Sequence, residues 1–191
     1  MFACLLELTL FRRGHGPGRF QHDAHEFLRA LCNAVAVASL APFKFGDDAA
    51  RNFAELTTLP NVLFGFDVKR ITRCDECGSA CETNERVLDL DIPIPDTNAC
   101  QQLRSLIASM FADEQLVGRE QYECNACGRH CDAVRQTIID STPAVLIVHL
   151  MRFGFGNDAR KLATPVAVLP RMEFGGAIYE LVRRLLFFEL R

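Results

Sequence analysis

The sequence lacks the features that mark several large classes of protein. It has no run of five or six like charges, and its formal net charge is only −3 with a pI near 6.0, so nucleic acid is not expected as a partner. Its apolar stretches fall far short of the roughly 20 residues that span a bilayer. The N-terminus carries no basic segment ahead of a long apolar one, which argues against a signal peptide. We therefore expect no membrane partner.

Cysteine is too sparse for a secreted disulfide scaffold. The chain has nine cysteines in 191 residues, which is below the roughly 8–10% typical of such scaffolds, and their number is odd. In a reducing compartment, spaced cysteines bind metal more often than they pair with each other. We expect a cytoplasmic or nuclear protein.

The hydrophobic periodicity predicts a single α+β domain with an antiparallel sheet. Apolar residues recur at helical spacing over 21–38 and 103–111, and they alternate with polar residues over 87–94. Residues 63–73, 133–139 and 144–153 have the composition of further strands, and 179–191 of a terminal strand or helix. Pro42 and Pro60 predict that residues 40–61 are irregular.

Two short motifs of the form CxxCG carry the clearest chemical signal. They are Cys74-Asp75-Glu76-Cys77-Gly78 and Cys124-Asn125-Ala126-Cys127-Gly128. Two residues between cysteines let both sulfurs of a tight turn face one ion, and the glycine supplies a positive φ. Four thiolates form the closed tetrahedral shell of one structural Zn²⁺. The alternatives are two surface turns with reduced thiols and a thioredoxin-like redox centre, which would require a βαβ context.

The remaining cysteines have less specific explanations. Cys81 and Cys131 each lie four residues beyond a CxxC pair, where we favour an ordinary thiol over a reserve ligand. Cys4, Cys32 and Cys100 are interpreted as small hydrophobic residues.

Several segments, in the same order, resemble the ubiquitin-specific proteases, which are papain-like cysteine deubiquitinases. The residues that carry the resemblance are Gln21-His22-Asp23-Ala24-His25-Glu26-Phe27-Leu28, Leu63-Phe64-Gly65-Phe66, the two cysteine pairs, Glu114-Gln115-Leu116-Val117-Gly118 with Tyr122, Pro143 to Phe153 ending in Arg-Phe, and Lys161 to Pro170. The resemblance thus extends over about residues 21–170.

The resemblance implies an incomplete papain-like thumb-palm-fingers fold with a zinc-ribbon fingers element. One partial domain would cover 1–191, with a helical thumb remnant at 1–60, fingers with the zinc knuckles at 61–140, and palm strands with a divergent tail at 141–191. It also implies that Gln21, Asp23 and Glu26 contact ubiquitin or a ubiquitinated protein. Acidic groups at a helix start could pair with a basic peptide tail, although capping of the helix explains Asp23 and Glu26 equally well.

The catalytic segments of the resembled family have no match in this sequence. Its chemistry requires a thiolate nucleophile in a Gly-Asn-Thr-Cys-Tyr-like segment before the Gln-box and a histidine in a Gly-His-Tyr-like segment after the palm strands. Cys4 is the sole cysteine before Gln21, and no histidine follows His149. We therefore expect a chain that binds zinc and ubiquitin without hydrolysing ubiquitin conjugates by itself.

Three further expectations stay open at this point. One is a zinc-ribbon protein-interaction module without ubiquitin function. Another is an active cysteine hydrolase that uses Cys4. The last is a partner protein that covers core surface exposed by an incomplete fold.

Overall fold

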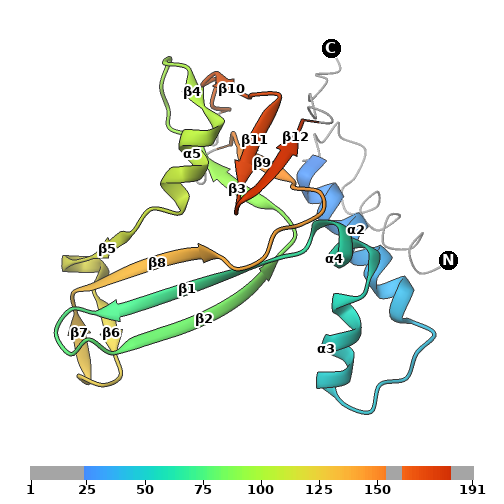
Figure 1. The fold of residues 1–191 in the computed structure, drawn as a ribbon, viewed down its shortest axis with the longest axis horizontal. Coiled ribbons are helices and arrows are strands. Elements are labelled where there is room, and N and C mark those ends of the chain that lie inside the picture. Colours follow the sequence, from blue (N-terminus) through green and yellow to red (C-terminus); the bar gives the residue numbers. More distant parts are fainter. Residues whose placement is uncertain (1–23, 154–160, 182–191) are drawn as a thin grey trace, which may run out of the picture. The chain divides into compact units, whose positions relative to one another are not determined.

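The computed structural model describes residues 24–153 and 161–181 (Figure 1). The described residues form two compact units. The helical unit contains residues 24–65 and 143–145, and the β unit contains residues 66–142 and the described part of 146–181. No helix in the described ranges is both long and apolar enough to cross a membrane.

The helical unit begins with α2 (Ala24–Leu40), which confirms the helix predicted from residues 21–38 over its described part. Cys32 and Ala34 are its buried residues, and Glu26 lies in its first turn. The first three residues of the predicted helix lie outside the described residues.

The irregular segment expected at 40–61 is instead largely helical. It contains α3 (Asp48–Leu56) and the start of α4 (Leu59–Phe64). Asp47 caps α3, because its Oδ1 accepts a 2.7 Å hydrogen bond from the Ala50 amide. Pro60 lies in the first turn of α4, where the missing N–H leaves no helical bond unmade. Pro60 therefore lies at the start of a helix and does not break one, which corrects the expectation of an irregular segment.

The β unit is built on a four-stranded antiparallel sheet in the order β2-β1-β8-β5. Its strands are β1 (Phe66–Cys74), β2 (Ala80–Val87), β5 (Glu114–Leu116) and β8 (Ala133–Ile139). The strand expected at 133–139 is confirmed. The strand expected at 63–73 begins only at Phe66, because Leu63 and Phe64 belong to α4.

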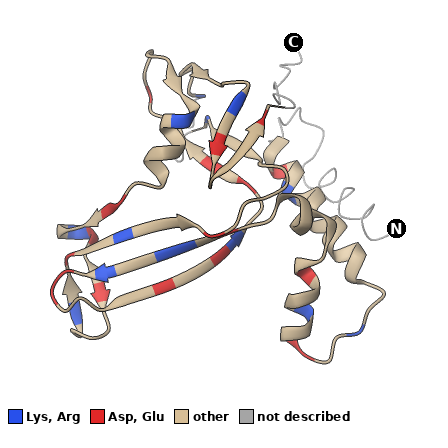
Figure 2. Cartoon of the chain, in the orientation of Figure 1, with Lys and Arg blue, Asp and Glu red and all other residues tan. Residues whose placement is uncertain are grey.

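Strand β2 was not predicted, because nearly all its residues are exposed and no apolar alternation marks it. Charged pairs connect it to β1 instead, including Arg86 with Asp67 at 2.9 Å and Arg70 with Glu85 at 2.6 Å. Figure 2 shows basic and acidic positions along both strands. Because each exposed ion pair contributes little to stability, the backbone hydrogen bonds between β1 and β2 are what hold β2 at the edge of the sheet.

The strand expected at 87–94 is β3 (Leu90–Pro93), and its neighbour β9 (Val148–Met151) runs parallel to it. The expectation that this strand joins an antiparallel sheet is therefore wrong. The predicted alternation is confirmed, since Leu90 and Ile92 are buried. The strand expected at 144–153 is limited to the four residues of β9.

The other elements of the β unit are short. They are β4 (Gln101–Gln102), α5 (Leu103–Met110), the 3₁₀ helix η1 (Gly118–Glu120), β6 (Tyr122–Cys124), β7 (Arg129–Cys131), β10 (Val166–Ala167), β11 (Arg171–Phe174) and β12 (Ala177–Glu180). Helix α5 confirms the helix expected at 103–111. The β6–β7 hairpin pairs with no other described strand.

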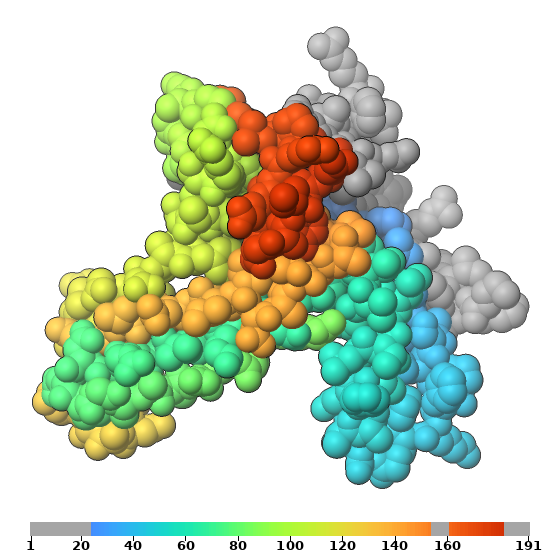
Figure 3. Space-filling view, viewed as in Figure 1, coloured from blue at the N-terminus to red at the C-terminus, as the bar shows by residue number. Residues whose placement is uncertain are grey.

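The core of the β unit lies between the sheet, α5 and the β11–β12 hairpin. Its buried members are Phe66, Val68, Leu90, Ile92, Leu103, Ile107 and Phe174. The Phe174 ring packs edge-on against Phe66, with ring centroids 5.6 Å apart, and also contacts Phe111 and Tyr179. Figure 3 shows the hairpin in red against the orange end of β8. The contact is close, since a Cβ added at Gly175 would lie 2.5 Å from Thr142 Cγ2.

Candidate functional site

The two CxxCG motifs form matching turns at strand ends. Cys74 ends β1 and Cys124 ends β6. Gly78 has φ +70° and Gly128 has φ +66°, which an L side chain rarely adopts. Each glycine amide donates to the carbonyl of the first cysteine in its motif, at 2.9 Å for Gly78 and 2.8 Å for Gly128. The positive φ inferred from the motif is therefore present in both turns.

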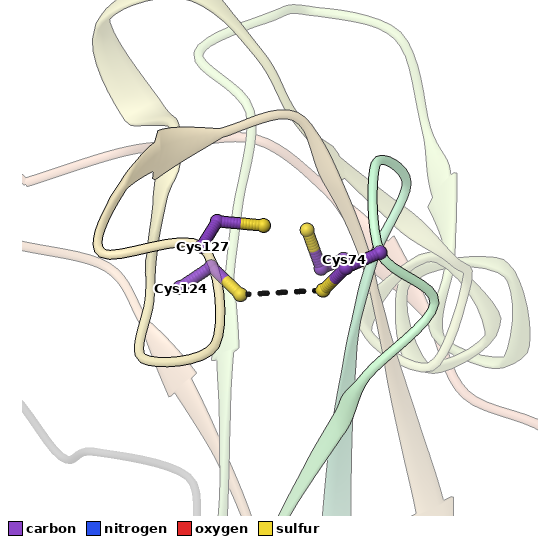
Figure 4. A group of neighbouring side chains, drawn as sticks. Cys74, Cys124 and Cys127 are labelled. Carbon is purple, nitrogen blue, oxygen red and sulfur yellow. Dashed lines mark hydrogen bonds between the residues drawn. The ribbon is translucent and has the colours of Figure 1, made fainter.

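The sulfurs of Cys74, Cys77, Cys124 and Cys127 all lie within 4.8 Å of one another. Figure 4 labels Cys74, Cys124 and Cys127, whose sulfurs are directed toward a common centre. A tetrahedral ion with metal–sulfur bonds of about 2.3 Å requires sulfurs about 3.8 Å apart. The Cys77 and Cys124 sulfurs are 3.6 Å apart. The donor set and its spacing fit a four-coordinate metal.

The environment of the cluster favours thiolates at some of its members. The hydroxyl of Ser79 and the backbone amide of Cys127 hydrogen-bond to the Cys124 sulfur, and these contacts lower the pKa of Cys124 to about 6. Ser79 also lowers the pKa of Cys77. In contrast, the hydrogen bond with the Cys77 thiol and burial raise the pKa of Cys127, since close thiols cannot all ionise without a cation.

Polar contacts hold the two turns together beside the sulfurs. The Asp75 amide donates to the Asp132 carbonyl at 2.9 Å and joins the two turns, and Gln121 Nε2 donates to Asp132 Oδ1 at 2.8 Å across the base of the β6–β7 hairpin. Arg129 forms an exposed ion pair with Glu76. Residues 79–123 separate the two motifs in the chain, so the cluster joins distant segments of one unit.

The other described cysteines differ in burial. Cys131 is fully buried against Cys74 and Cys124, and Cys32 is buried in α2. Cys81 and Cys100 are exposed. The interpretation of Cys100 as a small hydrophobic residue is therefore wrong, because it lies in a polar segment before β4. Cys4 lies outside the described residues.

The residues expected to contact ubiquitin are only partly described. Gln21 and Asp23 lie outside the described residues, and Glu26 is exposed in the first turn of α2. Glu26 belongs to the helical unit, whereas the four clustered cysteines belong to the β unit.

Sequence reasoning missed one polar contact of the β unit. Asp91 Oδ1 and His149 Nδ1 lie 2.7 Å apart on the paired strands β3 and β9. The two residues are 58 positions apart, and no local pattern reveals the register of parallel strands. The contact shows that His149 has a carboxylate partner within its own sheet.

The fold and the sequence together define the class of this protein. Residues 11–175 match the profile of the family described as "Ubiquitin carboxyl-terminal hydrolase", and the chain belongs to that family. The mixed α+β fold confirms the fold class inferred from sequence. A chain in a structure of the yeast SAGA DUBm shares this fold, with a TM-score of 0.67 and 25% identity over 78% of this chain and 34% of that one.

Individual relatives are similar over much of the chain. Ubiquitin carboxyl-terminal hydrolase 17 of Arabidopsis thaliana is 33% identical over 79% of this chain and 20% of its own length. Ubiquitin C-terminal hydrolase 15 of Oryza sativa subsp. japonica is 31% identical over 73% of this chain and 14% of its own. A chain of a SAGA DUB module bound to monoubiquitin has a TM-score of 0.67 at 23% identity, over 88% of this chain and 36% of that one. The matched part of the chain covers 14% to 32% of the length of these and six further curated relatives.

Proposed function

We propose that this chain is a zinc-holding and ubiquitin-binding part of a deubiquitinating hydrolase. The observation that carries the proposal is the family match over residues 11–175, together with four cysteine sulfurs gathered at metal-ligand spacing. The family reaction is the hydrolysis of ubiquitin conjugates.

The metal of the proposal is one structural Zn²⁺ held by Cys74, Cys77, Cys124 and Cys127. Four thiolates close the tetrahedral shell and leave no position for a substrate or a reactive water, which is typical of a structural rather than a catalytic site. The ion would join the β1–β2 turn to the β6–β7 hairpin. Elemental analysis of the 191-residue chain, purified without chelator, is expected to give about one zinc per chain. A value near zero would refute this assignment.

The partner of the proposal is ubiquitin, contacted by Gln21, Asp23 and Glu26. Support comes from the family and from the SAGA DUB module structures, two of which are described as bound to monoubiquitin and to ubiquitin aldehyde. Glu26 is available for such a contact because it is exposed at the N-terminal end of α2. A carboxylate there complements the basic side chains of a peptide tail.

A charge-reversal pair tests this contact by isothermal titration calorimetry with ubiquitin. Glu26→Lys is expected to weaken binding by about fivefold or more, which corresponds to about 1 kcal/mol for an exposed ion pair. Asp48→Lys is the matched control, since Asp48 is also exposed in the first turn of a helix of the same unit. An equal loss of ubiquitin affinity in the two variants would show that Glu26 does not contact ubiquitin. No measurable binding by the unmodified chain would favour a zinc-ribbon interaction module instead.

We further propose that the 191-residue chain does not hydrolyse ubiquitin conjugates by itself. No segment in it resembles the nucleophile or histidine segments of the family, and loss of either group costs several orders of magnitude in rate. Ubiquitin with a C-terminal electrophile is expected to form no adduct. An adduct that forms with the unmodified chain and disappears in Cys4→Ala would establish an active hydrolase.

A further inference from the structure

The two cysteine turns differ in the residue that follows each motif. Ser79 follows the first CxxCG motif, and Arg129 follows the second. Ser79 is half-buried, and its hydroxyl oxygen lies 3.0 Å from the Cys77 sulfur and 3.5 Å from the Cys124 sulfur. The Arg129 side chain is exposed and pairs with Glu76 instead. The Ser79 hydroxyl therefore contacts one proposed ligand from each turn.

The backbone of the first turn fixes the position of this hydroxyl. The Cys74 amide donates to the Ser79 carbonyl at 2.9 Å, which anchors Ser79 beside the end of β1. The Gly78 amide donates to the Cys74 carbonyl at 2.9 Å and closes the same turn. A serine has one side-chain torsion with three staggered positions, so few places are open to its oxygen once the backbone is held. The turn that holds Cys74 and Cys77 thus also places the hydroxyl.

A bound metal fixes the direction of the hydrogen bonds between this hydroxyl and the sulfurs. Without a metal, either the thiol or the hydroxyl can be the donor. A metal-bound thiolate carries no proton and can only accept, so the Ser79 hydroxyl is the donor in the metal-loaded centre. Because a hydroxyl has one proton, it serves one sulfur at a time, and the shorter contact favours Cys77.

Cys77 is the proposed ligand that solvent reaches most easily. Its side chain is exposed in the turn between β1 and β2, whereas Cys74 and Cys124 are each only 1% exposed. An accessible thiolate is open to protonation and to attack on electrophiles. A hydrogen bond to the sulfur lowers its basicity and with it its nucleophilicity. The donor therefore lies beside the ligand that has most need of one.

We propose that Ser79 is a positioning residue of the metal centre, whose hydroxyl donates to the Cys77 thiolate, with the Cys124 thiolate as its second acceptor. The hydroxyl does not bind the metal. It orients the exposed ligand and connects the two turns beside the ion. Removal of such an outer hydrogen-bond partner typically lowers metal affinity by about 10–100-fold. This inference rests on the proposed zinc site.

Three substitutions in the full 191-residue chain test the proposal. Ser79→Ala removes the hydroxyl, and Ser79→Thr keeps it. Arg129→Ala is the matched control, because Arg129 follows the second motif as Ser79 follows the first and its side chain pairs with Glu76. Zinc affinity is measured by competition against a chromophoric chelator. Spectra of the Co²⁺-loaded proteins report the number of thiolate ligands and the energy of the sulfur-to-metal charge-transfer band. Mass spectrometry follows the alkylation of Cys77 by iodoacetamide in the zinc-loaded proteins.

We expect Ser79→Ala to lower zinc affinity by about 10–100-fold while four thiolates remain on Co²⁺. Its charge-transfer band should move to lower energy, because the Cys77 sulfur loses the proton that stabilises its lone pairs, and Cys77 should be alkylated faster. Ser79→Thr should keep the band, the alkylation rate and, within about threefold, the affinity of the unmodified chain. Arg129→Ala should change neither the band nor the alkylation, and its affinity should stay within about threefold, because an exposed ion pair contributes little.

Two results would overturn the inference. An unchanged charge-transfer band and alkylation rate in Ser79→Ala, whatever its affinity, would show that the hydroxyl does not donate to the thiolate. A band shift of the same size in Ser79→Ala and Ser79→Thr would show that the shift does not come from loss of the hydroxyl. Failure of the unmodified chain to bind zinc is distinguishable from both, since it overturns the proposed zinc site and this inference with it.

Discussion

Removal of zinc should let the two cysteine turns open locally, while the hydrophobic core of the β unit stays folded. The β6–β7 hairpin has strands of only three residues and pairs with no other described strand. An isolated two-stranded hairpin is marginally stable in water. Its buried neighbours are mostly the cysteines themselves, so little apolar surface holds it when the sulfurs have no ion.

The loss of stability on zinc removal depends on how the proposed ligands are divided between the two turns. Two proposed ligands come from each turn, so opening either turn leaves only two thiolates on the ion. Opening is therefore coupled to the whole metal-binding free energy. With free zinc at about 1,000 times Kd, this linkage contributes about 4.1 kcal/mol, which makes the open state about 1,000-fold rarer and amide exchange through that state about 1,000-fold slower.

Residue-resolved hydrogen exchange by NMR, with and without chelator, measures this coupling. The amides of Gly78 and Gly128 close the two turns and should lose about 1,000-fold of protection when zinc is removed. The Leu90 amide bonds to the Ile147 carbonyl beside the separate core, so its protection should change by less than about threefold. Unchanged protection of the glycine amides, or an equal loss of protection at Leu90, would refute a metal that holds only the two cysteine turns together.

Two further substitutions test the packing and the turns. Phe174→Ala should lower the free energy of unfolding by about 3–5 kcal/mol in urea titrations, because the ring is buried among three aromatic rings. The control Ile178→Ala, at a side chain 77% exposed, should change it by less than about 0.5 kcal/mol. Similar small values for both variants would contradict the described core. Gly128→Ala should cost about 1–2 kcal/mol and lower zinc affinity by about 5–30-fold, because its φ is positive. Gly46→Ala, in open space without positive φ, should leave zinc affinity unchanged; equal affinity for both variants would show that the turn does not constrain the site.

Local chemistry explains what the sequence could predict. The CxxCG turns, with their positive-φ glycines, need only five consecutive residues each. Helix α5 and strand β8 follow directly from hydrophobic periodicity. Helix α4 was not predicted, because a proline is favoured in the first turn of a helix but disrupts a helix interior.

Long-range pairing explains what the sequence could not predict. Strand β2 has no apolar alternation, and its pairing with β1 becomes visible only in the register of the ladder. The parallel pairing of β3 with β9, and with it the contact of Asp91 with His149, joins segments 58 residues apart. The position of Cys131 beside the cluster likewise depends on the hairpin register, so the sequence alone could not distinguish it from Cys81.

We propose that this chain, with its zinc in place, binds ubiquitin. The most direct measurement is an NMR titration of ¹⁵N-labelled ubiquitin with the zinc-loaded 191-residue chain. We expect shift changes that saturate below about millimolar chain and include the basic C-terminal tail of ubiquitin, and we expect smaller changes with Glu26→Lys. A ubiquitin spectrum that stays unchanged at about millimolar chain would contradict the account.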